Sequence, residues 1–218
     1  MFKISRSNLD SISKSYNSKK TLGETNHELL DLYKQIIWNI IDLTNKFSVY
    51  EMSHWINNKD RWIYNRNTDN RKEYHRSCIV IVDLGATNFR YEPSFAHPCI
   101  VLVDRFNSML IAPCSSKKYG KGLRNIIDAK KDIDGFSIDT GIQIESIRWV
   151  HKNRVVSIAG HASPRIMEAI DKYILSITPA YRREKAKIKA IKSELITSKK
   201  EIEKLNNEIK VLKLEHKA

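Results

Sequence analysis

The feature that most constrains the fold of this chain is a series of short β-branched runs between Cys78 and Gly160. The runs are CIVIVDL, CIVLVD, MLIAP, GIQIESI and RVVSIAG. Runs of this length and composition are typical of strands, and the polar segments between them are typical of turns. Their close spacing predicts a small, strongly curved antiparallel β-sheet or β-barrel, and we assign this domain to residues 73–178.

A helix is predicted to close this domain. Ser163 is a good N-cap residue, and Pro164 suits the first helical position. Apolar residues then recur on one helical face, namely Ile166, Met167, Ile170, Tyr173 and Ile174. Pro179 is expected to end this helix, because proline cannot continue a helix that is already hydrogen-bonded.

Residues 1–72 are predicted to form a helical extension with a polar linker. Apolar residues recur at steps of three and four from about Thr25, at Leu29, Leu32, Tyr33, Ile36, Ile37, Ile40, Ile41 and Phe47. The tryptophans of this region, Trp38, Trp55 and Trp62, are interpreted as core or interface anchors. The polar stretch from Asn57 to Asn70 is predicted to be a loop or linker.

Residues 179–218 contain a heptad array. Position a is held by Ile188, Leu195, Ile202 and Ile209, and position d by Ile191, Ser198, Leu205 and Leu212. Four heptads correspond to about 42 Å of helix at the usual rise per residue. The array predicts a C-terminal coiled-coil helix.

Charges beside the heptad core indicate how this helix would pair. Position g carries Glu194, Glu201, Glu208 and Glu215, and position e carries Lys192, Lys199 and Lys213. A parallel pair brings g glutamates toward lysines at the next e position, whereas an antiparallel pair opposes like charges. We therefore predict a parallel homodimeric coiled coil, and packing on the N-terminal helix of the same chain is the alternative.

Composition narrows the partners and the compartment. A net charge of +13 favours a polyanionic partner, with nucleic acid first, an acidic protein second and a membrane surface third. The chain has no apolar run long enough to cross a membrane, and residues 1–10 lack the pattern of a secretory signal, so a cytoplasmic protein is expected. Cys78, Cys99 and Cys114 lie in or beside apolar runs and are interpreted as buried thiols.

His97 marks the start of one predicted strand. It precedes Pro98, and the residue before a proline favours extended backbone. It also follows a loop of mixed polar and aromatic residues, 85–96, where functional side chains are often found. Because imidazole titrates near neutral pH, His97 is a candidate acid or base.

Ser115 and Ser116 mark the end of the next predicted strand. They open a predicted loop of about twenty residues, from Lys117 to about Phe136, which is longer than a connection needs. Its first part is cationic, with Lys117, Lys118, Lys121 and Arg124, and its glycines Gly120 and Gly122 allow a ligand to approach the backbone. Hydroxyls, amides and cations together at a strand end predict a phosphate site.

From Arg76 to Leu175 the order of elements resembles the MazF/PemK family of toxin endoribonucleases, which are small β-barrels with a closing helix from bacterial toxin–antitoxin modules. Four segments carry the resemblance. RSCIVIVDLG is similar to the family's RGDIVxVDLG, and FAHPCIVLVDRFN to GxRPxxVLxxxxxN. MLIAPCSS is similar to xxVxPITS, and IESIRWVHKNRV to xDQIRTIDKxRL.

The resemblance implies an α+β fold, a MazF/PemK-type barrel with a closing helix, here flanked by the N-terminal helical region and the C-terminal coiled coil. It also implies an endoribonuclease that cuts single-stranded RNA without a metal or cofactor, through attack of a 2′-hydroxyl on the adjacent phosphate. An antitoxin and a second copy of the chain are the implied protein partners.

Site residues follow from the matched positions. His97 stands where the family has a catalytic arginine, Ser115 replaces its threonine, and Glu145 is the acidic residue of the fourth segment, so these three are the candidate catalytic residues. The candidate RNA-binding residues are Ser116, Lys117, Lys118, Lys121 and Arg148. If the family's arginine chiefly stabilises charge, activity with a histidine should rise as the pH falls.

Two other functions fit the same sequence. One is a toxin of this barrel type that poisons a protein, as the related gyrase-directed CcdB family does. The other is a non-catalytic barrel that binds nucleic acid or supports assembly, with its helices carrying the function.

Overall fold

The computed structural model describes residues 2, 6–14, 27–88 and 92–215 of the 218 residues. These divide into two compact units, one comprising Met1–Thr68 with Gly85–Asn88 and the other comprising Asp69–Leu84 with Phe89–Ala218. No helix among the described residues is long and apolar enough to cross a membrane.

The first unit is helical, with α1 (Arg6–Ser13), α3 (His27–Thr44) and α4 (Val49–Asn65). The predicted helix start at about Thr25 lies outside the described residues. Ser48 caps α4: its hydroxyl accepts from the Glu51 amide at 3.2 Å, and the Glu51 carboxylate accepts from the Ser48 amide at 2.9 Å. Such a reciprocal cap satisfies two amides that would otherwise lack partners.

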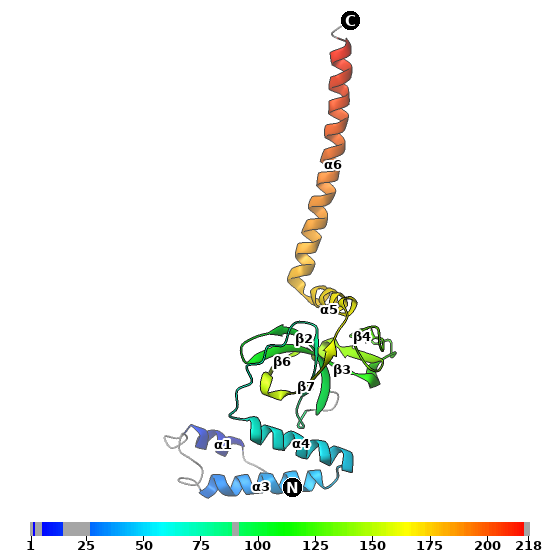
Figure 1. The fold of residues 1–218 in the computed structure, drawn as a ribbon. Coiled ribbons are helices and arrows are strands. Elements are labelled where there is room, and N and C mark those ends of the chain that lie inside the picture. Colours follow the sequence, from blue (N-terminus) through cyan, green and yellow to red (C-terminus); the bar gives the residue numbers. More distant parts are fainter. Residues whose placement is uncertain (1, 3–5, 15–26, 89–91, 216–218) are drawn as a thin grey trace. The chain divides into compact units, whose positions relative to one another are not determined.

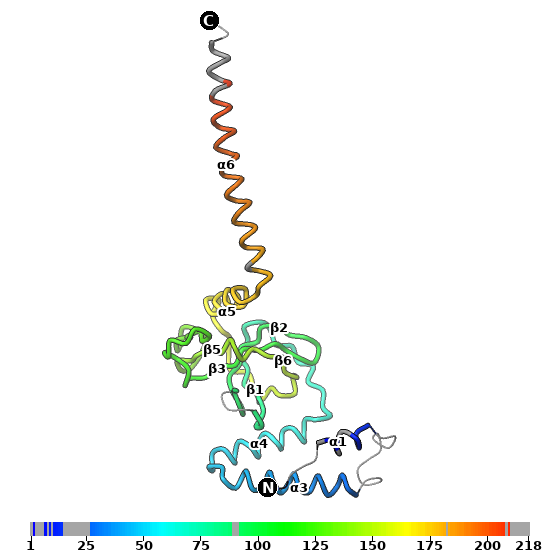
Figure 2. The backbone as a smooth tube through the Cα atoms, turned by 180° about the vertical axis from the view of Figure 1, so that it is seen from behind, coloured from blue at the N-terminus to red at the C-terminus, as the bar shows by residue number. Residues whose placement is uncertain are grey.

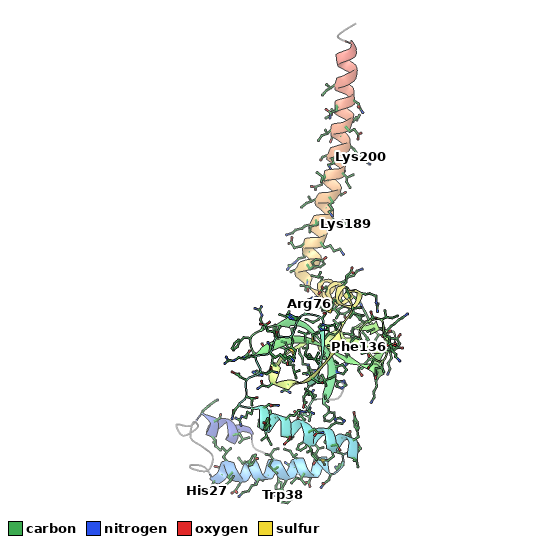
Figure 3. The ribbon with its side chains drawn as sticks, in the orientation of Figure 1. His27, Trp38, Arg76, Phe136, Lys189 and Lys200 are labelled. Carbon is green, nitrogen blue, oxygen red and sulfur yellow. The ribbon has the colours of Figure 1, made fainter. Side chains whose placement is uncertain are left out.

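The predicted loop over residues 57–70 was wrong for its first half, because α4 continues to Asn65. The Ser48–Glu51 cap stabilises the start of this helix, and the cost of asparagines within a helix is modest. Trp38 and Trp62 are more than half exposed in the single chain, so they are not core residues. Figure 3 labels Trp38 on α3.

The second unit contains a seven-stranded antiparallel sheet (Figures 1 and 2). Its strands are β1 (Cys78–Asp83), β2 (Ala96–Asp104), β3 (Ser108–Ser115), β4 (Ile126–Ala129), β5 (Thr140–Gln143), β6 (Arg148–His151) and β7 (Val155–His161). The order is β4-β5-β3-β2-β1-β7, and β6 pairs with the first half of β3. The α+β class is confirmed, although the ladders among the described residues form an open path rather than a closed barrel.

Two apolar clusters lie on opposite faces of this sheet, because side chains alternate along a strand. One contains Ile79, Ile100 and Cys114 of the strands with Ile166 and Ile170 of α5. The other contains Val80, Val82, Cys99, Val101 and Ile111. All three cysteines are buried and free, as predicted.

The closing helix is confirmed as α5 (Pro164–Ile177), with the Ser163 hydroxyl accepting from the Ile166 amide at 3.3 Å. Arg76, labelled in Figure 3, donates to Asp171 of α5 at 2.6 Å and to the carbonyl of Leu102 at 3.1 Å. These bonds join α5 to the segment before β1. A 37-residue helix, α6 (Pro179–Glu215), follows.

The predicted loop from Lys117 to Phe136 was partly wrong, because it contains β4. Ile126, Ile127 and Ala129 pair there with β5. Charged and polar neighbours such as Asp128 break the apolar pattern that would predict this short strand. Phe136, the last residue of the predicted loop, is buried in the core cluster that includes residues of α5.

Candidate active site

His97 and Ser115 lie at the same end of the β2–β3 pair. The ladder pairs Cys99 with Pro113 and Ile100 with Ala112, and continuing this register brings His97 opposite Ser115. Directly opposed residues of an antiparallel pair project from the same face. Both side chains are partly exposed, so the two predicted catalytic groups share one accessible end of the sheet.

The orientation of His97 follows from a contact with the neighbouring strand. Its Nδ1 atom lies 3.2 Å from the carbonyl oxygen of Cys114. A carbonyl oxygen only accepts, so Nδ1 carries the proton in this contact and the lone pair of the neutral ring lies on Nε2. The contact thus holds the imidazole of β2 against the end of β3.

Ser115 stands between β2 and β5. On its other side it pairs with Gly141 of β5, which has no side chain to cover it. The Ser115 hydroxyl precedes the short helix η2 (Ser116–Lys118) but makes no capping hydrogen bond to it. The hydroxyl can therefore donate to a bound phosphate.

Arg148 lies on the same face of the sheet. It pairs with Ile111 on β3, and Ile111, Pro113 and Ser115 alternate onto that face. Burial raises the pKa of the nearby Cys99 thiol well above its ordinary value, Cys114 raises it further, and the positive charge of Arg148 partly opposes this rise. Arg148 thus adds a cation to the face that carries His97 and Ser115.

Glu145 is not joined to Arg148 in the described part of the structure. It is exposed on η3 (Ile144–Ser146), and within the described residues it forms no ion pair with Arg148. Arg148 instead donates through Nε to the carbonyl of Ser146 at 3.4 Å. The structure brings His97, Ser115 and Arg148 onto one face but does not join Glu145 to Arg148.

The cationic segment begins directly after Ser115. Ser116 and Lys117 are exposed on η2, Lys118 is partly buried, and Lys121 is exposed beyond it. Within this segment, the amide of Gly120 donates to the Asp128 carboxylate at 3.1 Å, which ties the segment to β4. Lys117 and Lys118 thus follow Ser115 within three residues of the end of β3.

Two residues that position this segment were not predicted. A Cβ atom at Gly141 would lie 2.8 Å from the backbone carbon of Lys118, so only glycine lets η2 approach β5 this closely. Asp128 is the second, through its bond to Gly120. Gly141 opens a predicted strand, and a glycine within a strand is a signal for close backbone approach.

No metal site is evident in the described part of the chain, where no three His, Cys, Asp or Glu side chains gather closely enough to hold an ion. The side chains that this site offers are an imidazole, a hydroxyl and several cations.

Comparisons with known proteins cover the sheet domain. A structure search finds similarity to the Mycobacterium tuberculosis toxin MazF-mt6, with 12% identity over 44% of this chain and 89% of that chain and a TM-score of 0.35. A search among curated proteins finds no match. The family model of the PemK-like, MazF-like toxins of type II toxin–antitoxin systems matches residues 75–178, which span all seven strands and α5. Residues 75–178 are accordingly a domain of the PemK-like, MazF-like toxin family.

Proposed function

We propose that this chain is the toxin of a type II toxin–antitoxin module and that it cleaves single-stranded RNA without a metal ion. The observation that carries the proposal is the placement of His97 and Ser115 on one accessible face, beside a cationic segment, within a domain of this toxin family. An antitoxin, a homodimer formed through the sheet domain and a cytoplasmic location belong to the same proposal.

In the proposed reaction, Nε2 of His97 accepts the proton of an RNA 2′-hydroxyl. The 2′-oxygen then bonds to the adjacent phosphorus, and the bond from phosphorus to the 5′-oxygen breaks. The products are a 2′,3′-cyclic phosphate and a 5′-hydroxyl end, with the leaving oxygen taking a proton from water. General base help of this kind is typically worth about 10² to 10⁴ in rate.

Charge on the phosphate grows as the 2′-oxygen attacks. The Ser115 hydroxyl and the ammonium groups of Lys117 or Lys118 are proposed to donate to the phosphate oxygens, and Arg148 to hold the RNA on the same face. Ser116 and Lys121 are proposed to contact the neighbouring backbone. Donors fixed in place before the reaction stabilise developing charge most effectively.

Glu145 is proposed to act at a distance rather than in proton transfer, by placing a negative charge near the start of β6. Its exposed position leaves it free to orient Arg148 once RNA is bound. A Glu145→Gln variant is therefore expected to weaken cleavage less than changes at His97 or Ser115.

Incubation of the purified chain with a mixed single-stranded RNA, followed by sequencing of the ends, tests the proposal. We expect cuts that leave 5′-hydroxyl ends in the presence of a chelator. Intact RNA would contradict the proposal and favour a toxin that poisons a protein. RNA that is bound but uncut would favour a non-catalytic module.

A further inference from the structure

We propose that α6 pairs with α6 of a second copy as a parallel, in-register, two-stranded coiled coil. This interaction surface lies outside the toxin-family domain and does not depend on the proposed cleavage. Three observations support it: an exposed apolar seam, the charges beside that seam, and the residue types within it.

The seam consists of the a and d positions of the heptads. Its described apolar members are Ile188, Ile191, Leu195, Ile202, Leu205 and Ile209, which are 48–62% exposed in the single chain. Burial of such side chains is favourable, so a partner helix that covers a seam of this length gains considerable stability. A partner helix with the same repeat covers it in full.

Charge complementarity identifies the partner as a second copy. In a parallel pair, Glu194 at position g faces Lys199 at the next e position of the second copy, and Lys199 faces Glu194 in return. The same spacing recurs at Glu208 and Lys213, whose side chains lie outside the described part of the structure. Reversing one helix would bring glutamates against glutamates.

One pair works against the assembly. Lys187 at position g would face Lys192 of the second copy, although Glu184, 2.9 Å from Lys187 on the same helix, reduces that repulsion. Ser198 at position d also weakens the middle of the seam. The repulsion is smaller than the gain from the apolar positions, because interactions between exposed charges contribute little to stability.

The residue types at the seam favour two strands. Three of the four a positions are isoleucine, and two of the four d positions are leucine. β-Branched residues at a with leucine at d favour a parallel dimer over higher oligomers. We therefore infer a dimer rather than a trimer.

Single cysteines introduced into the full chain test the register. The three native cysteines are buried, so an added thiol is the accessible one. Ile188→Cys and Ile202→Cys lie at position a, where the two copies of one residue meet in a parallel pair. Ile196→Cys is the matched control, because Ile196 is 57% exposed but lies at position b, away from the seam.

We expect Ile188→Cys and Ile202→Cys to form covalent dimers under mild oxidation, reversible by reductant, while Ile196→Cys stays monomeric on a denaturing gel. Cross-linking of Ile202→Cys alone would indicate an antiparallel pair and overturn the proposal. Equal cross-linking of all three would indicate random collision, and no cross-linking would leave α6 to another occupant, such as the N-terminal helices. Equal cross-linking and absent cross-linking would each overturn the proposed coiled coil, whether or not the chain cuts RNA.

A charge exchange gives a second, independent readout. Glu194→Lys and Lys199→Glu each place like charges in the pair when alone, but together they restore both attractions in a mixed dimer. With one chain tagged, we expect the two variants to form mixed dimers in preference to self-paired ones. A statistical mixture of dimers would contradict the parallel register.

Discussion

The Nδ1 atom of His97 lies 3.2 Å from the carbonyl oxygen of Cys114, the residue that precedes Ser115. This contact joins the start of β2 to the end of β3 and orients the imidazole. The proposed catalysis depends on that arrangement, because a neutral ring whose Nδ1 donates to a carbonyl carries its lone pair on Nε2.

The pH dependence of cleavage distinguishes a base from a stabilising charge at His97. As a base, the imidazole must be neutral, so we expect cleavage to fall as the pH is lowered from 8 to about 5. His97→Arg, which restores the residue of the family pattern, is expected to remove this acid limb, because arginine keeps its charge throughout. A rate that rises on acidification would show that His97 acts through its charge instead.

The Gly141→Ala change tests whether the position of the cationic segment matters for RNA binding. Gly141→Ala would force a Cβ atom to 2.8 Å from the backbone of Lys118, and displacement of η2 should weaken RNA binding several-fold while the thermal unfolding midpoint falls modestly. Gly122→Ala is the control, because no atom lies within 4 Å of its added methyl group and only its left-handed backbone is strained, at about 1–3 kcal/mol. Equal effects of the two changes on RNA binding would argue against a specific role for η2.

Asp134 is expected to limit stability in acid. Burial raises the pKa of its carboxyl, but hydrogen bonds from Arg165, Ser163 and the Lys130 amide outweigh burial and lower the pKa from 3.8 to about 2. The folded state therefore binds this proton less readily than the unfolded state. Its contribution, on the order of 2 kcal/mol, is present above about pH 4 and is lost as the pH falls toward 2.

Asp134→Asn should remove that acid-dependent part of the stability, which chemical denaturation at pH 2–6 measures. Asp139→Asn is a matched control, because Asp139 is an exposed aspartate of the same segment that accepts the amide of Lys131 at 2.8 Å. An unchanged pH profile for Asp134→Asn would refute this role.

Removal of the residues after Pro179 separates assembly from catalysis. We expect the truncated chain to dissociate at higher concentrations than the full chain, because linked sites raise the effective concentration of each other. Cleavage of short RNAs per sheet domain should change little. Sedimentation measures the dissociation, and a fluorogenic RNA measures the cleavage rate. An unchanged mass together with a large loss of cleavage would contradict the proposed division of roles.

The sequence predicted those parts of the fold that depend on local pattern. The β-branched runs gave β1, β2 and β3, and the Ser163-Pro164 start gave α5. The strand β4 was missed because Asp128 interrupts its short apolar run and Lys130 follows it, while its stability comes from pairing with β5. The extension of α4 was missed because its asparagines masked the apolar spacing of Trp62 and Ile63.

The candidate site was foreseen only in part. His97 and Ser115 could be proposed from the ends of two consecutive strands, because a hairpin brings such ends together. The role of Gly141 could not, because it depends on η2 approaching a strand that is distant in sequence. Glu145 and Arg148 were both candidate site residues of the fourth matched segment, yet the two side chains form no ion pair in the described structure.

The most direct test is cleavage of single-stranded RNA by His97→Ala and Ser115→Ala beside two matched controls, His161→Ala and Ser157→Ala, which change exposed residues of β7. We expect His97→Ala to lose about 10²- to 10⁴-fold and Ser115→Ala about 10²- to 10³-fold in rate, with both still folded by circular dichroism. The two β7 variants should cleave as the unmodified chain does. Unchanged cleavage by His97→Ala and Ser115→Ala would contradict the proposal that these two side chains act on one phosphodiester.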